Sequence, residues 1–230
     1  MSHPRIALSI APILAAVALL NVVSVRAATL TLEYDHSFGS VMADGSAPWL
    51  TAVFDDGGSP GTVSLTLTVA NTIDEADITA LYFNLDPILD PNDLTLTRTG
   101  GSGPAGNKIS VSTGINSYKA DGDGWYDIFI DLPPPPGSDG HRFNAGENLM
   151  FDINGIPVLT ANSFNFFSLD SGGAGPFIAA AKVQETGPSP FEGSDWIAPS
   201  LVTTPVPIPA AVWLFVSALG VLGWRRRRAN

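Results

Sequence analysis

The stretch Val63-Ser64-Leu65-Thr66-Leu67-Thr68-Val69 alternates apolar and polar residues without a break. Successive side chains of a β-strand point to opposite faces of the sheet. The pattern therefore predicts a strand with Val and Leu on one face and Ser and Thr on the other. An antiparallel sheet commonly packs one such face on a core and exposes the other to water. The stretch indicates an antiparallel β protein.

Similar short segments recur along the chain, and residues that favour turns separate them. Turn chemistry is present at residues 56–58, 100–101, 121–124, 144–146 and 172–173. No intervening segment has the period of a long helix. This spacing predicts an all-β fold, an antiparallel β-sandwich that is jelly-roll-like. The predicted strands cover residues 30–34, 63–69, 81–85, 94–97, 109–112, 126–132, 149–153, 164–169 and 177–183.

The N-terminal segment has the pattern of a secretory signal peptide over residues 1–27. Arg5 precedes an apolar stretch over residues 6–23, and Val25-Arg26-Ala27 presents small or aliphatic residues where a signal peptidase cleaves. Cleavage between Ala27 and Ala28 would leave the following domain outside the cytoplasm. An uncleaved anchor is the alternative, because the apolar stretch is long.

The C-terminal segment predicts a membrane helix. Residues 210–224 contain no charge and no proline. As a helix they would span about 22 Å, and including residues 208–209 brings the length closer to the roughly 30 Å of a hydrocarbon core. Residues 198–204 are expected to be a linker from a domain over residues 28–197. We predict a transmembrane helix over 208–224. A cluster of four arginines follows the helix and would keep that end in the cytoplasm by the positive-inside rule. This arginine stop consists of Arg225, Arg226, Arg227 and Arg228.

The order Val206-Pro207-Ile208-Pro209-Ala210-Ala211-Val212-Trp213-Leu214-Phe215, followed by Ser217-Ala218-Leu219-Gly220 and the arginines, resembles the PEP-CTERM sorting signal. The resemblance implies a bacterial envelope protein that a membrane protease-transpeptidase, the exosortase, processes. Ile208 stands where the namesake motif has glutamate. A plain membrane anchor is the alternative. The sorting motif is expected at Val206, Pro207, Ile208 and Pro209.

Parts of the middle of the chain resemble a recurrent group of exported β-rich domains that carry this signal. The resemblance rests on residues 47–56, 81–87, 119–124 and 193–197. It implies a β-rich surface domain and brings no activity or functional residues with it.

Composition limits the classes of partner. Residues 28–200 hold all 22 acidic residues and five of the 11 basic ones, which gives a net charge of −17. A balance this negative argues against binding to nucleic acid or to anionic lipid. The chain has no cysteine, which excludes thiol chemistry and cysteine-ligated metals.

The best local motif for a metal is Asp121-Gly122-Asp123-Gly124-Trp125-Tyr126-Asp127. Calcium takes six to eight oxygen ligands, and carboxylates separated by glycines can supply several of them in one turn. We therefore expect weak calcium binding at Asp121, Asp123 and Asp127. The alternative is a hairpin turn, in which Asp-Gly supplies the positive φ angles.

The sequence offers candidate residues for two further chemistries. Trp49, Trp125, Tyr126 and Trp196 could form platforms for sugars, with packing in the core as the alternative. His36 with the adjacent Ser37 is a weak candidate for nucleophilic catalysis, since no nucleophile-elbow motif is present. His141 is expected at the surface.

We expect a non-enzymatic protein of the cell envelope or extracellular matrix that is exported through signal peptidase and exosortase. Its expected role is structural or adhesive in a biofilm or exopolysaccharide matrix. A calcium-assisted carbohydrate-binding module is the alternative, and a polysaccharide-acting enzyme is the third.

Overall fold

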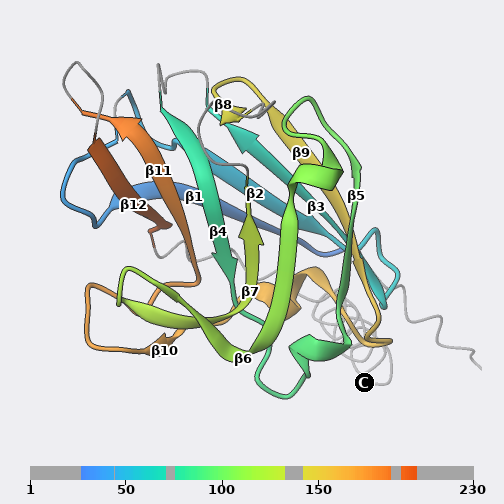
Figure 1. Cartoon of the computed structure of the whole chain (residues 1–230). Coiled ribbons are helices and arrows are strands. Elements are labelled where there is room, and N and C mark those ends of the chain that lie inside the picture. Colours follow the sequence, from blue (N-terminus) through green and yellow to red (C-terminus); the bar gives the residue numbers. More distant parts are fainter. Residues whose placement is uncertain (1–26, 44, 71–75, 133–141, 188–192, 201–230) are drawn as a thin grey trace, which may run out of the picture.

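The computed structural model describes residues 27–43, 45–70, 76–132, 142–187 and 193–200 (Figure 1). The predicted sorting motif, membrane helix, arginine stop and most of the signal peptide lie outside these ranges. Within them, no helix has the length and apolar character needed to cross a membrane.

Strands dominate the described residues, and the helices there are single 3-10 turns. The prediction of an all-β fold is confirmed. The elements are β1 (Thr29–Ser37), β2 (Leu50–Asp55), β3 (Thr62–Val69), β4 (Asp77–Phe83), η1 (Pro91–Asp93), β5 (Thr95–Gly100), η2 (Gly106–Lys108), β6 (Ser110–Ala120), β7 (Gly124–Asp131), β8 (Phe143–Asn144), β9 (Asn148–Asn154), η3 (Ala161–Phe164), β10 (Leu169–Asp170), β11 (Ala179–Thr186) and β12 (Gly193–Pro199).

All strand pairs are antiparallel, and they follow one hydrogen-bonded succession, β10-β7-β4-β11-β12-β1-β2-β3-β9-β5. β6 adds to β7, and β8 adds to β4. The succession folds over between β12 and β1, so that β4 and β11 lie across from β1, β2 and β3 (Figure 1). An antiparallel sandwich results, and its jelly-roll connectivity stays a prediction.

The core lies between the two layers. Val63, Leu65, Leu67 and Val69 of β3 are at most 1% exposed, as the alternation of the sequence predicts. Phe54 of β2 meets Phe83 of β4 edge to face, with ring centroids 5.3 Å apart. These contacts join the layers into one apolar core.

The predicted strand over residues 164–169 is wrong for most of its length. The side chains of Thr160 and Ser163 form a reciprocal capping box that starts η3, and β10 has only two residues. Phe164 instead stacks on Phe54 at 4.4 Å between ring centroids. The apolar character of this segment therefore reflects core packing around a helical turn.

β2 and β12 were not predicted. β12 lies between β11 and β1 and continues through Ala198 and Pro199, two residues that the sequence placed in the linker. Gly, Pro and Ser around this segment are typical of a linker, so the sequence did not predict a strand here. The inward side chain of the strand, Ile197, is nevertheless fully buried.

Candidate functional site

The two outer faces of the sandwich differ in composition. On β3 the outward residues are Ser64, Thr66 and Thr68, the polar pattern expected of a face in water. On β4 every residue is buried, and Tyr82 points outward beside the inward Leu81 and Phe83. The outer face of the layer that contains β4 therefore carries apolar and aromatic side chains where the outer face of β3 carries polar ones.

Aromatic side chains form a continuous row across this face. Its members come from β6, β7, β4 and β12, from the residue after β1 and from the segment before β11. Neighbouring ring centroids lie between 4.6 Å and 6.4 Å apart. We call this row the aromatic strip, and its rings are Phe177, Phe38, Trp196, Tyr82, Phe129 and Tyr118.

Strand register explains how the strip is assembled. Tyr82 of β4 stands directly opposite Phe129 of β7, and their rings stack at 4.9 Å. Ala180 of β11 faces Tyr82 on its other side and is fully buried. Because Ala180 is small, Trp196 reaches across β11 to within 5.7 Å of the Tyr82 ring. Cross-strand aromatic pairs of this kind stabilise a sheet while they expose an apolar surface.

All the rings of the strip except Tyr82 are partly exposed. An open depression of about 440 Å3 lies beside them, and Lys182, Gln184 and Asp131 line it together with Tyr82 and Phe129. Burial, followed by the charge of Asp131, raises the pKa of Tyr82 to about 12. The phenol therefore stays neutral at physiological pH. The site combines apolar rings with polar groups at their edge.

One end of the strip carries a histidine. The His36 ring lies 5.6 Å from the Phe177 ring and stacks on Phe38 at 6.5 Å. Ser37, its neighbour, donates from Oγ to Oδ2 of the buried Asp195 at 2.7 Å. His36 thus belongs to the aromatic surface, whereas Ser37 holds the loop after β1. His141 lies outside the described residues.

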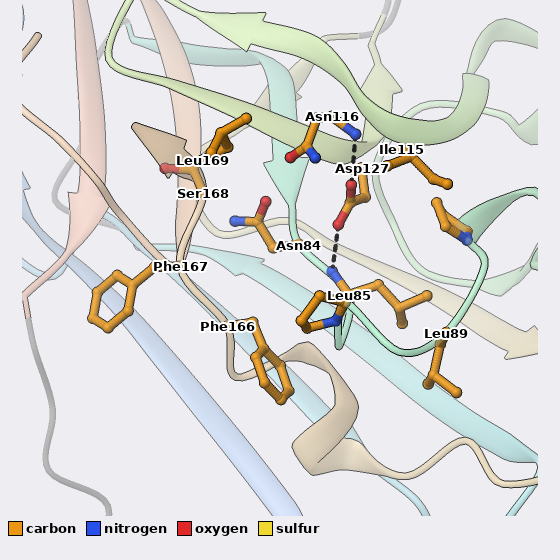
Figure 2. A pocket seen from close by; sticks show the side chains of 12 residues that line it. Asn84, Leu85, Leu89, Ile115, Asn116, Asp127, Phe166, Phe167, Ser168 and Leu169 are labelled. Carbon is orange, nitrogen blue, oxygen red and sulfur yellow. Dashed lines mark hydrogen bonds between the residues drawn. The ribbon is translucent and has the colours of Figure 1, made fainter. Parts of the chain in front are cut away.

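A second concave site lies just beyond the C-terminal end of β4, and Figure 2 shows the side chains that line it. This cavity of about 420 Å3 is floored by polar groups, and its mouth carries apolar side chains of unusual exposure. We call it the asparagine pocket. Its lining includes Asn84, Asn116, Asp127 and Ser168 on the polar side, and Leu89, Ile115, Phe166, Phe167 and Leu169 on the apolar side.

The three predicted calcium ligands have different positions. Asp121 is exposed at the turn between β6 and β7, with φ of 43°. Asp123 is 5% exposed and accepts a hydrogen bond from the backbone N–H of Ala174. Burial, which outweighs the hydrogen bond from Ala174, raises the pKa of Asp123. Within the described ranges, no group of three or more His, Cys, Asp or Glu side chains is arranged to hold a metal ion.

Asp127, the third predicted ligand, forms part of the floor of the asparagine pocket. Its Oδ2 accepts from the Leu85 N–H at 3.0 Å, and its Oδ1 accepts from the Asn116 N–H at 2.8 Å. Both carboxylate oxygens therefore bind backbone, as the dashed lines of Figure 2 show. Calcium binding at Asp121, Asp123 and Asp127 stays a prediction, and the hairpin turn at residues 121–124 is present.

The four aromatic residues singled out in the sequence divide between surface and core. Trp196 lies in the aromatic strip. Trp49 is 5% exposed and packs in the main core, and Tyr126 is fully buried beneath the strip. Trp125 is partly exposed on β7, where the Lys119 ammonium lies 5.2 Å from its ring centroid.

Sequence reasoning missed most of the aromatic strip. One signal was available in the sequence: residues 80–83 and 128–130 do not alternate between apolar and polar. In a strand with one face in water, the outward positions are normally polar, but here aromatic residues occupy them. Which of these residues share a face depends on the β-bulges of β4 and β6. Phe38 and Phe177 lie outside the observed strands. Phe38 belongs to no predicted strand, and Phe177 begins the predicted strand over residues 177–183 without being recognised as a surface ring.

Comparison with known proteins adds little. No protein-family model matches the sequence, and no curated protein matches it. Two solved structures show a weak likeness. One is a biomass-sensing module from Rsgi-like proteins of Clostridium thermocellum, described as resembling family 3 carbohydrate-binding modules, with a TM-score of 0.30 and 10% identity over 66% of this chain and 90% of that one.

The other is a family 3b carbohydrate-binding module from a scaffoldin of the Bacteroides cellulosolvens cellulosome. Its TM-score is 0.29 and its identity 12%, over 69% of this chain and 92% of that one. Because the TM-scores and sequence identities are this low, we infer function from the residues of the site alone.

Proposed function

We propose that this protein is an exported component of a bacterial surface or extracellular matrix that holds polysaccharide on its aromatic strip. One observation supports the proposal most directly, the row of six neighbouring aromatic rings across the outer face of β6, β7, β4 and β12. Five of these rings are partly exposed, and aromatic side chains are enriched at binding interfaces. The role is binding, structural or adhesive, and not catalytic.

Sugar rings match this surface chemically. A pyranose has an apolar face of C–H groups, which packs on aromatic rings, and a rim of hydroxyls, which need hydrogen-bond partners. Lys182, Gln184 and Asp131 stand at the edge of the rings and can supply them. A polymer would contact several rings at once, so that weak single contacts add up to useful avidity.

The charge of the domain narrows the polysaccharide class. Residues 28–200 carry a net charge of −17, which disfavours approach by a polyanion. We therefore propose an uncharged polysaccharide as the ligand.

Co-sedimentation of the full chain with insoluble uncharged polysaccharides, cellulose and chitin among them, tests the proposal. Trp196→Ala should weaken binding at least about fivefold, as expected of a central interface residue. Trp125→Ala is the matched control, because Trp125 is a partly exposed tryptophan that is not one of the rings of the strip. Equal binding by the wild type and Trp196→Ala across the panel would refute the proposal.

The route to the surface is a separate proposal. Signal peptidase would cut after Ala27, the helix over 208–224 would hold the protein in the inner membrane, and exosortase would process the Val206–Pro209 motif. Intact mass in membrane and medium fractions tests this order, since a processed chain begins at Ala28 and ends near residues 205–209. Neutral substitutions of Arg225 to Arg228 should weaken retention.

A further inference from the structure

We propose that the asparagine pocket is a second binding site, and that it takes a single uncharged pyranose unit. Its volume, about 420 Å3, falls within the roughly 300–1,000 Å3 of small-molecule sites. The pocket lies beyond the end of β4, and its lining includes no ring of the aromatic strip. Binding there needs no contact with the strip.

The floor of the pocket is held rigidly and keeps polar groups available. Asn84 is 2% exposed, and its Nδ2 donates to the carbonyls of Ile178 at 3.0 Å and Phe177 at 3.4 Å. These bonds fix the side chain, and its Oδ1 accepts no hydrogen bond from the described residues. Figure 2 shows the Asn84 amide between Ser168 and Asp127, with the Asn116 side chain across from it.

The Asn116 side chain supplies the second polar group. Its backbone N–H binds Asp127 at 2.8 Å, while its amide makes no hydrogen bond to the described residues. The pocket therefore offers one free acceptor from Asn84 and both a donor and an acceptor from Asn116. Neighbouring hydroxyls of a sugar, each of which donates and accepts, match this set.

The mouth of the pocket supplies apolar contact. Ile115 is 61% exposed, Leu169 is 56% exposed and Phe167 is 51% exposed, and all three line the pocket. These side chains are among the most exposed large apolar residues of the described chain. An apolar rim around a polar floor suits a ring that has hydroxyls at its edge and C–H groups on its face.

The charge of the lining excludes acidic ligands. No Lys, Arg or His lines the pocket, and its one ionisable group is the carboxyl of Asp127. A uronic acid or a phosphate would face that carboxylate without a cation to balance it. The ligand class is therefore a neutral pyranose.

The test is a titration of the full chain in a detergent that has no sugar headgroup. The ligands are the methyl glycosides of glucose, galactose, mannose and N-acetylglucosamine, and glucuronate is the charged comparison. Backbone amide NMR shifts of Leu85 and Asn116 locate binding, because both amides contact Asp127. We expect saturable shifts with at least one neutral glycoside and none with glucuronate.

Asn116→Gly is the diagnostic variant, since φ of 45° at this position suits glycine. Loss of its hydrogen bonds should weaken binding roughly three- to tenfold. Asp121→Gly is the control, because Asp121 is also exposed with φ of 43° but lies outside the pocket lining. Ile115→Ala provides a second variant on the apolar rim.

The outcomes separate this site from the aromatic strip. Shifts confined to the Trp196 indole would overturn the pocket and leave the strip intact. Shifts at Leu85 and Asn116 that Asn116→Gly weakens support the pocket, even where Trp196→Ala leaves polymer binding unchanged. No shift at these amides with any neutral glycoside, or stronger shifts with glucuronate, would overturn the proposal.

Discussion

The backbone N–H of Ala28 donates a hydrogen bond to Oδ1 of Asp56 at 2.8 Å. The same oxygen accepts from Gly58 at 2.9 Å, and Oδ2 accepts from Ala161 at 3.4 Å. Asp56 is only 7% exposed. One carboxylate thus joins the start of β1, the turn after β2 and the start of η3.

Cleavage at the predicted site would convert this contact into an ion pair. A chain that begins at Ala28 has an α-ammonium group next to Asp56, and a charge-assisted hydrogen bond is stronger than a neutral one. We expect the free energy of unfolding to be about 1 kcal/mol higher for this chain than for the same chain acetylated at Ala28. Thermal unfolding of both forms measures the difference.

Asp56→Asn should abolish this gain, whereas Asp55→Asn, one residue earlier in an exposed turn contact with Gly57, should preserve it. A gain of equal size in Asp56→Asn would show that the ammonium group acts elsewhere.

Two tryptophans should separate stability from binding. Trp49→Ala removes a ring that is 5% exposed in the main core, and we expect it to lower the free energy of unfolding by about 3–5 kcal/mol. Trp196→Ala removes a partly exposed ring of the strip, so its cost in stability should be smaller while polysaccharide binding falls. Chemical unfolding followed by circular dichroism gives the first quantity and co-sedimentation the second. The reverse ranking of the two variants in stability would contradict our division between core and strip.

Asp77 should make stability depend on pH. Its side chain is fully buried beside Arg142, with Oδ1 3.2 Å from Nη1. Burial raises the pKa of Asp77 to about 6, although Arg142 opposes the rise, compared with about 3.9 in an unfolded chain. Between these values the folded protein binds more protons than the unfolded one. This group's contribution to stability is therefore fully present below about pH 4 and is lost as the pH rises through about 6.

Asp77→Asn should remove that slope. We expect the difference in unfolding free energy between wild type and variant to change by on the order of 2 kcal/mol between pH 4 and pH 7. Urea unfolding at several pH values measures it, with Asp152→Asn on β9 as the control. A parallel pH profile for wild type and Asp77→Asn would contradict the prediction.

Asp127 distinguishes a structural carboxylate from a calcium ligand. Asp127→Asn keeps one acceptor oxygen and loses the other, which leaves the N–H of Leu85 or of Asn116 without its partner. We expect a loss of about 1–3 kcal/mol in stability, and the loss should be the same with calcium and with a chelator. A loss seen only when calcium is present would instead support the predicted metal site.

Local alternation was enough to predict two of the strands that have one wet face. β3 and β9 follow the period-two rule, and both were predicted within about two residues of their ends. β12 was not predicted because Gly, Pro and Ser surround it, although β11, one of its hydrogen-bond partners, lies just before it in the sequence. Its other partner, β1, lies at the far end of the described chain, so β12 is specified by tertiary contacts more than by its own composition.

The site was harder to predict than the fold. Trp196 was recognised as a candidate, but its neighbours Tyr82 and Phe129 are placed beside it by the register of β4 with β7 and by the bulge between β4 and β11. A shift of one residue would turn either ring into the core. The asparagine pocket depends on a left-handed residue, Asn116, and on three segments that meet only in the folded chain.

β12 is hydrogen-bonded on both sides, to β11 and to β1, and the N–H of Ser200 just after it donates to Asp35 Oδ1 at 2.7 Å. Any tension on the chain beyond Ser200 therefore acts along an interior strand. Both ladders are loaded in shear, so many hydrogen bonds share the force instead of breaking one after another from an edge. We therefore expect the domain to resist pulling from its C-terminal end, a mechanical property that would suit the proposed tether beyond residue 200 and the proposed binding of a polymer to the sheet.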